Sequence, residues 1–317
     1  MRASDVVTKP AWSCFAHDTL QHAAHIMWER GCGMLPVVDA ARRVVGVITD
    51  RDVCMAAYTR GLRLWQMSVG STMTTAVHVV REHVPLESVE TTMRCGHVRR
   101  VPVVDDGGTL SGVVSIDDIA RAHRRAGPTA ESLADQIVVN TMAEICQRGP
   151  MRVSCPEARV VSDLMTRTVH HCRTCDGLHR VAGSMWDHDC GALPVVDEAG
   201  RAVAMVTDRD ACMAAYTRGE ALDAIPVTVA ASHAVHSVRP DTELAVAEAV
   251  MRMHRIRRLP VLDIGGNLVG MLSIADIVRN ARRPIEPGDA LGFEKVAATL
   301  ESVYRPDDAR LLGAAGG

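Results

Sequence analysis

Residues 49–61 read Thr-Asp-Arg-Asp-Val-Cys-Met-Ala-Ala-Tyr-Thr-Arg-Gly, and the stretch returns with one change at residues 207–219. The second copy begins 158 residues after the first. Just before each copy, Leu-Pro-Val-Val-Asp occurs at 35–39 and at 193–197, with the same offset. A constant offset over so many positions indicates a duplicated unit without net insertion or deletion.

The segment around the first copy predicts the element order β-α-β-β-α. Residues 12–15 suit a short strand, followed by a helix from a cap at Asp18 to Arg30, with Gly31 as its stop. Apolar residues at 20, 23, 24 and 27 follow the helical period. Residues 35–38 and 44–48 predict two strands, and Thr49 opens a second helix that ends near Gly61.

The same order returns 66 residues after each copy, with weaker identity, so the chain contains four units in two pairs. We expect an α/β fold (α+β in stricter usage) of two pseudo-symmetric modules that stack into a disc, within one chain or between two chains. The expected divisions are a first pair at 1–124 (motifs about 6–61 and 71–124), a helical linker at 125–158 with a helix at 130–147, a second pair at 159–283 (about 163–219 and 229–282), and a C-terminal helix and tail at 284–317, helical at 291–305.

Composition limits the class of protein. Of 317 residues, 47% are hydrophobic but only 3% aromatic, so small aliphatic side chains must fill the core. A net charge of −3 gives no general attraction to nucleic acid or to acidic membranes. The chain has no apolar run of about 18 residues and no signal-peptide layout. We therefore expect a cytoplasmic protein whose ten cysteines are reduced.

Each unit combines a Pro-centred strand ending in Asp with a later Thr or Ser followed three residues on by Asp. This pattern, repeated four times, resembles the cystathionine β-synthase (CBS) domains, which occur in pairs called Bateman modules. The resemblance implies a regulatory module that binds adenosine-type ligands in clefts between paired motifs, with AMP, ADP and ATP ahead of NAD and S-adenosylmethionine. It implies that the Asp holds the ribose hydroxyls and that the Thr or Ser lies near ribose and phosphate. The matching positions are Thr49, Asp52, Ser115, Asp118, Thr207, Asp210, Ser273 and Asp276.

We call each Thr or Ser, together with the Asp three residues later, a box. The four boxes also have a purely structural interpretation. A hydroxyl residue followed three positions later by an acid resembles a helix capping box, although Asp reaches back less well than Glu or Gln. A carboxylate can equally accept two hydrogen bonds from a ribose diol, and the free N–H groups of a helix start attract phosphate. Both roles stay open for each box.

Six arginines are candidate phosphate ligands, because the guanidinium fork suits phosphate oxygens. In the second and fourth units an Arg pair precedes the Pro-centred strand, where a solvated helix end is the alternative. In the first and third units one Arg precedes the Asp of the box, where it either faces the central cleft or lies on the helix surface. These residues are Arg99, Arg100, Arg257, Arg258, Arg51 and Arg209.

The third unit departs from the pattern. It has Ala204 where the other units have Gly46, Gly112 and Gly270 before the box. Glycine permits close backbone approach, so its loss predicts a narrowed pocket. We expect the site at Thr207 and Asp210, and to a lesser degree the one at Thr49 and Asp52, to be altered or empty.

The segment from His170 to His179 contains Cys172-x-x-Cys175 and histidines, but it lacks a second Cys-x-x-Cys, so we expect no metal there. The alternatives to nucleotide sensing are a metal- or redox-responsive protein and a purely structural oligomerisation module. We call the first and third units the odd units and the second and fourth the even units. In the odd units we expect Cys54 and Cys212 to be core thiols and Cys32 and Cys190 to be thiols open to oxidation.

No Ser-His-Asp order, Walker loop or metalloprotease motif is present, so we expect no catalytic residues and no enzyme. No obligatory cofactor is expected beyond the regulatory nucleotide. The expected partners are an adenosine nucleotide, a second copy of the chain in a homodimer and an effector protein, and neither nucleic acid nor a membrane.

Overall fold

The computed structural model describes residues 1–125 and 158–281, together with seven helical positions at 139, 141, 142, 145, 296, 299 and 300. The helices expected at 130–147 and 291–305, and the tail, lie largely outside the described residues. Within the described ranges the same arrangement of elements occurs four times, which confirms the α/β class and the four-unit organisation.

The first unit comprises β1 (Cys14–Phe15), α2 (Leu20–Glu29), β2 (Met34–Val38), β3 (Val44–Thr49) and α3 (Asp50–Arg60). Strand β1 runs parallel to β2, and β2 runs antiparallel to β3. The cap of α2 is Thr19 rather than Asp18, because the Thr19 hydroxyl accepts from the His22 N–H at 3.2 Å. The predicted apolar stripe of α2 is fully buried, and Gly61 ends α3 in the left-handed conformation.

The other units repeat this arrangement. The second comprises β4 (Val80–Arg81), α4 (Leu86–Gly96), β5 (Arg100–Val104), β6 (Leu110–Ser115) and α5 (Ile116–Arg125). The third comprises β7 (Cys172–Arg173), α8 (Leu178–Asp187), β8 (Ala192–Val196), β9 (Ala202–Thr207) and α9 (Asp208–Arg218). The fourth comprises α11 (Leu244–His254), β10 (Arg258–Leu262), β11 (Leu268–Ser273) and α12 (Ile274–Ala281), with a bridge from Val238 to Val261 in place of its first strand. Short helices connect these elements: α1 (Ala3–Val6), α7 (Val161–Leu164), α10 (Val227–Ala230) and the 3-10 turns η1 (Leu64–Gln66), η2 (Val69–Ser71) and η3 (Leu222–Ala224).

The two units of a pair exchange their leading segments. Thr8, which precedes the first unit, bridges Val113 in β6 of the second unit. Thr74, which precedes the second unit, bridges Val47 in β3 of the first. The second pair repeats the exchange, with bridges from Thr166 to Met271 and from Ser232 to Met205. Each box strand is therefore flanked by a segment from the partner unit.

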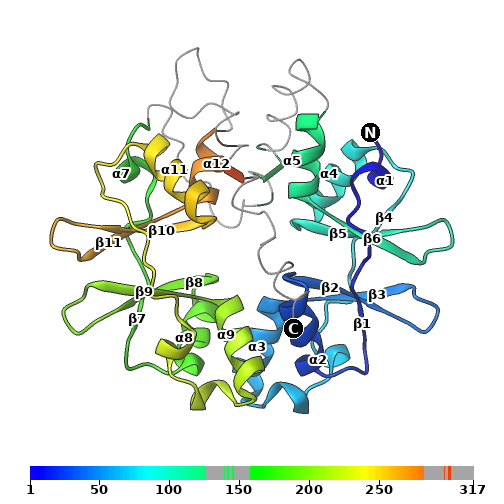
Figure 1. The fold of residues 1–317 in the computed structure, drawn as a ribbon, viewed down its shortest axis with the longest axis horizontal. Helices are drawn as coiled ribbons and strands as arrows, with labels where there is room; N and C mark the ends of the chain where they lie inside the picture. Colours follow the sequence, from blue (N-terminus) through cyan, green and yellow to red (C-terminus); the bar gives the residue numbers. More distant parts are fainter. Residues whose placement is uncertain are drawn as a thin grey trace, which may run out of the picture.

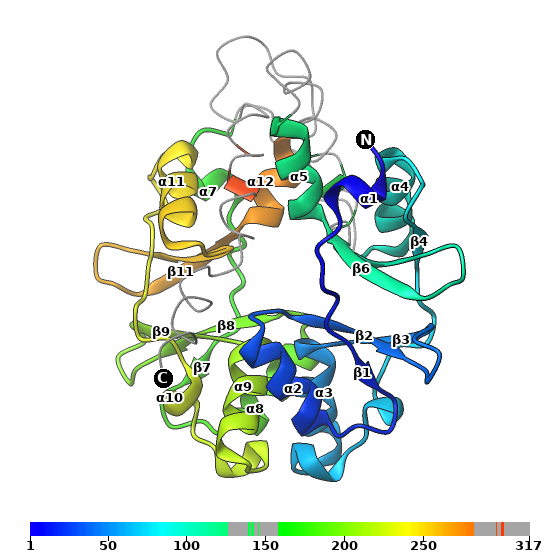
Figure 2. The ribbon, with the colours of Figure 1, turned by 45° about the vertical axis from the view of Figure 1, so that its right-hand side comes forward.

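Two hydrophobic cores join the halves of the chain into a ring. One core combines the first and third units, where α2 and α3 pack against α8 and α9. The other core combines the second and fourth units. Figure 1 shows the four units around a common centre, with the first half on the right and the second on the left, and Figure 2 shows the same pairing after rotation. The expected disc thus forms within one chain.

The glycine before each box makes room for the chain itself. A Cβ on Gly46 would lie 2.6 Å from Met73 Sδ and 3.2 Å from the Thr74 carbonyl oxygen, both in the exchanged segment. At the matching positions of the third unit, 158 residues later, the pair is Ala204 and Ala231, both buried. Because the smaller Ala replaces Met, the third unit has space for a methyl group. Ala204 therefore gives no reason to expect a narrowed ligand pocket.

This compensation predicts a coupled pair of substitutions. Gly46→Ala should destabilise the protein by about 1–3 kcal/mol, because the new methyl group overlaps Met73. Adding Met73→Ala should restore part of the loss, since the double variant reproduces the pair found in the third unit. Urea unfolding of the two single variants and the double variant gives the coupling energy. Additive effects would mean that Gly46 is required for another reason.

Candidate functional site

All four boxes form helix caps. In each, Oδ2 of the Asp accepts from both the N–H and the hydroxyl of the Thr or Ser, at 2.6–2.9 Å. The Asp N–H donates to the hydroxyl oxygen at 3.2–3.3 Å. The structural interpretation is therefore confirmed for every box. Capping uses only Oδ2 of each Asp. Any further hydrogen bond of the carboxylate must therefore be made by the other oxygen, Oδ1.

The boxes differ at that second oxygen. Arg121, one turn along α5, donates to Oδ1 of Asp118, and the Thr8 hydroxyl donates to the same oxygen at 3.2 Å. Arg279 donates to Oδ1 of Asp276 in the same way. The odd units have methionines at the positions of these arginines, and in the part of the chain that the structure describes no donor bonds to Oδ1 of their two aspartates. These are Asp52 and Asp210, with Met55 and Met213 one turn along. In the odd boxes Oδ1 of the Asp is thus available as a hydrogen-bond acceptor, whereas in the even boxes the same oxygen already accepts from an arginine.

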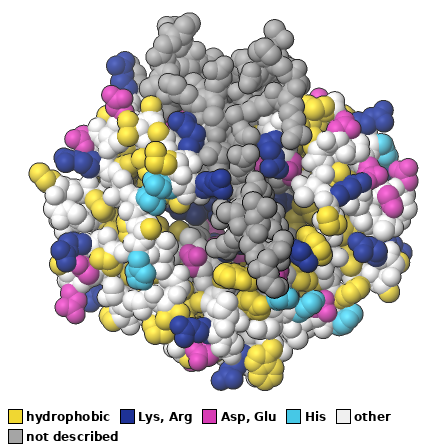
Figure 3. Space-filling view, viewed as in Figure 1, with side chains coloured by type: hydrophobic (Ala, Val, Ile, Leu, Met, Phe, Trp, Pro, Cys, Tyr) yellow, Lys and Arg dark blue, Asp and Glu magenta, His cyan; other side chains and the backbone are white. Residues whose placement is uncertain are grey.

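The arginine pairs of the even units lie beside the start of their own box helices. Arg100 pairs with Ser115 across β5 and β6, and Arg258 pairs with Ser273 across β10 and β11. The pKa of Arg100 is lowered mainly by burial and by neighbouring Arg99 and Arg257, while nearby acids oppose the change. Figure 3 shows Lys and Arg side chains bordering the centre of one face of the ring.

These arginines also act on the odd units. The carboxylate of Asp50, at the first position of α3, lies within electrostatic range of Arg100. In the second half, Arg258 acts in the same way on Asp208, at the first position of α9. The arginines of one unit and the box helix of its partner therefore face each other in both halves. Burial and the proximity of Asp50 raise the pKa of Asp208, and burial raises that of Asp210.

Arg51 and Arg209 cross from one half to the other. Arg209 Nη1 donates to the Cys32 carbonyl oxygen at 3.0 Å and to Asp50 Oδ2 at 3.1 Å. In return, Arg51 Nη1 donates to the Cys190 carbonyl oxygen at 3.0 Å and to Asp208 Oδ2 at 3.3 Å. We call these two reciprocal ion pairs the arginine clamp. In this structure the clamp gives both arginines a role in joining the halves.

Glycine makes the clamp geometrically possible. A Cβ on Gly33 would lie 2.8 Å from Asp50 Oδ2, and one on Gly191 would lie 2.9 Å from Asp208 Oδ2. Both glycines precede their Pro-centred strands at matching positions. A side chain at either position would displace the carboxylate that the opposite arginine binds.

Four hydroxyl residues that bridge the box strands were missed in the sequence. Thr8 reaches Asp118, and its counterparts in the exchanged segments are Thr74, Thr166 and Ser232. All four carry a hydroxyl and recur with the spacings of 66 and 158 residues. That spacing was the available clue, although it does not reveal that each segment pairs with the partner unit.

The candidate metal segment does not form a ligand cluster with any other described residues. In the described ranges no three His, Cys, Asp or Glu side chains gather as a metal site. Cys172 is buried, with its pKa raised to about 12 by desolvation, whereas Cys175 is exposed. His170 instead stacks on His188, with ring centroids 3.4 Å apart.

The expected core thiols are buried, and the expected reactive thiols are not activated. Cys54 and Cys212 are fully buried in the core of the odd units. Cys32 and Cys190 are half-buried, and burial raises the pKa of both thiols. A raised pKa lowers the thiolate fraction, which disfavours oxidation.

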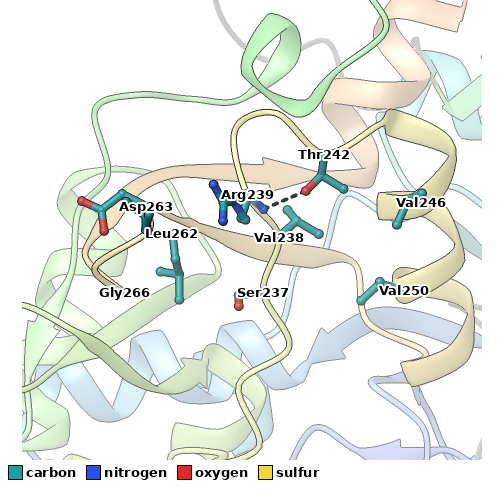
Figure 4. Close-up of a pocket in the computed structure, with 10 residues that line it drawn as sticks. Ser237, Val238, Arg239, Thr242, Val246, Val250, Leu262, Asp263 and Gly266 are labelled. Carbon is teal, nitrogen blue, oxygen red and sulfur yellow. Dashed lines mark hydrogen bonds between the residues drawn. The ribbon is translucent and has the colours of Figure 1, made fainter.

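A separate cleft of about 440 Å³ lies in the fourth unit, away from its box. Figure 4 shows it between α11 and the β10–β11 hairpin, with the Arg239 N–H donating to the Thr242 hydroxyl at 3.0 Å. Val246 and Val250 form part of its apolar lining, at positions where the second unit has Ser88 and Thr92. The cleft contains no residue of the four boxes.

The even boxes differ in one buried charge. Asp117, between Ser115 and Asp118, is only 6% exposed. Desolvation raises its pKa to about 7, although Arg100 counteracts the rise. The matching residue of the fourth unit is Ala275.

Comparison with known proteins identifies the family. The CBS domain model matches residues 3–58, 69–125, 161–216 and 225–283. The chain belongs to the CBS domain family. Of its relatives, the CBS domain-containing protein YhcV of Bacillus subtilis is 34% identical over 131 residues, 41% of this chain and 91% of its own. Hypoxic response protein 1 of Mycobacterium tuberculosis is 30% identical over 119 residues, 38% of this chain and 82% of its own.

A solved structure shares the fold of this CBS-domain protein across the chain. It is a Methanocaldococcus jannaschii protein proposed to be an archaeal homologue of g-AMPK, with a TM-score of 0.59 and 20% identity. The match covers 88% of this chain and 99% of that one.

Across the described residues, none of the helices has the length and apolar content needed to cross a bilayer.

The arginine clamp predicts a measurable stability difference. Arg209→Met should destabilise the protein by about 1–3 kcal/mol, because it removes the ion pair that Arg209 makes with the largely buried Asp50 carboxylate. Arg43→Met is the matched control, since Arg43 is 65% exposed in its ion pair with Asp39 and should change stability by less than about 0.5 kcal/mol. Equal effects in urea unfolding would contradict the role given to the clamp.

The buried Asp117 predicts a pH-dependent gain on its removal. Its pKa is raised from 3.8 to about 7 on folding, so between these values the native state holds a proton that the unfolded chain has released. Its contribution to stability therefore falls as pH rises through this window. Asp117→Asn should be more stable than the wild type at pH 8 by roughly 1–3 kcal/mol, with the difference fading near pH 4.

Urea unfolding at several pH values tests this, with the exposed Asp187→Asn as the control. A gain for Asp117→Asn that is the same at every pH would show that the charge of Asp117 is not its cause.

Proposed function

We propose that this protein is a regulatory sensor of adenosine nucleotides, with AMP, ADP and ATP as the ligands. The nucleotides bind in the clefts between paired units, with ribose at the box aspartates and phosphates toward the centre of the ring. The observation that carries the proposal is the unused carboxylate oxygen in each of the odd boxes. Asp52 and Asp210 each keep a carboxylate oxygen that no described donor uses, at the start of a helix.

The ribose assignment follows from that oxygen. A carboxylate oxygen without a protein donor can accept from a ribose hydroxyl without losing the cap, which depends on Oδ2. In the even boxes a ribose would have to displace Arg121 or Arg279 from the same oxygen. We therefore infer that the odd boxes bind first, the reverse of what the substitution at Ala204 suggested.

The phosphate assignment follows from charge. Arg100, with Arg99 and Arg257 as charged neighbours, lies within electrostatic range of Asp50 at the start of α3, and Arg258 lies within range of Asp208 at the start of α9. Guanidinium groups and the free N–H groups of a helix start both favour phosphate. A nucleotide with its ribose at Asp52 would direct its phosphates to this central group of arginines.

The clamp links these sites to the shape of the ring. Asp50 and Asp208, which adjoin the ribose-binding aspartates, also bind the arginines of the opposite half. A phosphate that draws Arg100 or Arg258 toward itself changes the charge around the clamp. Ligand binding would thereby shift the packing of the two halves, and an effector protein that prefers one packing would read the change.

The main test compares conservative variants of the boxes. Asp52→Asn and Asp210→Asn should each weaken nucleotide binding by roughly tenfold or more, because a charge-assisted hydrogen bond is lost. The amide oxygen still accepts the capping bonds, so the melting temperature without ligand should change little. Asp118→Asn and Asp276→Asn should affect binding less. Calorimetry with AMP, ADP and ATP measures these effects, with Asp187→Asn as the control.

Two results would contradict the proposal in different ways. Wild-type affinity in the Asp52→Asn/Asp210→Asn double variant would refute the ribose assignment. Absence of binding by any of the three nucleotides to the wild type would refute the sensing function and favour a structural oligomerisation module.

A further inference from the structure

The charged groups around the centre of the ring match almost residue for residue between the halves. Each group of the first half has a counterpart of the same charge 158 residues later. The matched pairs are Asp50 and Asp208, Arg51 and Arg209, Asp52 and Asp210, Arg99 and Arg257, Arg100 and Arg258, Asp118 and Asp276, and Arg121 and Arg279. Among these positions and their immediate neighbours in the box helices, one charge is unmatched, since Asp117 has Ala275 as its counterpart.

Asp117 is placed to act on the phosphate site. It follows Ser115 by two residues, and Ser115 pairs directly with Arg100 across the sheet. The N–H of Ile116, next to Asp117, donates to the Arg99 carbonyl oxygen at 3.0 Å, which holds the start of α5 against the arginine pair. Asp117 is buried, so water screens its charge weakly.

The fourth unit has the same frame without the acid. Arg258 pairs with Ser273, and the Ile274 N–H donates to the Arg257 carbonyl oxygen at 2.9 Å. At position 275 the side chain is a methyl group. The arginine pair of the second half therefore lacks the carboxylate that offsets the pair of the first half.

We propose that this difference makes the two halves select ligands of different charge. With Asp117 beside Arg100, the first half favours a nucleoside monophosphate. With Ala275 in that place, the second half favours a nucleoside di- or triphosphate. The inference rests on the proposed function and extends it, because it assigns Asp117 and position 275 as the residues that determine specificity.

The physical basis is the repulsion between Asp117 and ligand phosphates. ATP carries about two more negative charges than AMP, so a fixed carboxylate disfavours ATP more strongly. The groups that face Asp117 are Arg99, Arg100, Asp118 and Arg121. Arg100 extends this set to Asp50 and Arg257. All of these groups have a counterpart of the same charge in the other half, so they do not produce the asymmetry. They are Asp50, Arg99, Arg100, Asp118, Arg121 and Arg257.

The experiment exchanges the residue between the halves. The full chain is compared as wild type, Asp117→Asn, Ala275→Asp and Ala275→Asn, by calorimetry at pH 8 with AMP, ATP and inorganic tripolyphosphate. Asp117→Asn should raise ATP affinity in the first-half site by roughly three- to tenfold and AMP affinity by about twofold or less. Ala275→Asp should lower ATP affinity in the second-half site by a similar factor, whereas Ala275→Asn should not.

A pH series separates charge from shape. Near pH 5.5, where Asp117 is largely protonated, the ATP affinities of the wild type and Asp117→Asn should converge. Protonation of ATP itself cancels, because both proteins are measured with the same ligand at the same pH.

The outcomes distinguish this inference from the proposed function. If the wild type binds adenosine nucleotides but the ratio of ATP to AMP affinity is unchanged in Asp117→Asn and in Ala275→Asp, the specificity assignment is wrong and the sensing function stands. If no nucleotide binds, the sensing function fails, and tripolyphosphate still tests the charge difference. Equal or absent tripolyphosphate binding in all four proteins overturns the inference.

Discussion

The packing of α3 against α9 is the contact on which the ring depends. These helices carry the duplicated stretch, they contact each other across the two halves, and each has five consecutive buried residues. Consecutive buried positions are unusual on a helix, since a surface helix normally buries one stripe. Here the helix touches its own sheet on one side and the other half of the chain on the other. That double burial explains why this stretch is the best preserved part of the repeat.

The arginine clamp fixes the register in which α3 packs against α9. Apolar packing between two nearly identical helices would tolerate sliding, because small side chains such as those at 56, 57, 214 and 215 fit in several registers. The pairs Arg51–Asp208 and Arg209–Asp50 are satisfied in one register only. They also hold the starts of both helices close together at the centre. The groups that align the halves thus adjoin the box aspartates Asp52 and Asp210 in the sequence.

Much of this was accessible from the sequence, for identifiable reasons. The repeat spacing and the period of Leu20, Ala23, Ala24 and Met27 gave the units, the elements and the buried face of α2, because these are local patterns. The capping boxes were also readable as local hydrogen-bond motifs. The roles of Arg51 and Arg209 were left open, because their partners lie in the other half of the chain. The reason why Ala204 can replace glycine was also hidden, since its neighbour Ala231 comes from an exchanged segment that no local pattern reveals.

The construction of the two cores has a consequence for the origin of the chain. Each core takes one unit from each half, so a single half on its own would leave two apolar helix faces uncovered. Two separate half-length chains could cover those faces only by associating, which makes the ring a fused version of a two-chain assembly. Fusion turns a concentration-dependent association into an intramolecular one. It also frees the halves from being identical, and a covalently joined pair can then evolve two unlike sites where a symmetric dimer would be restricted to two equal ones.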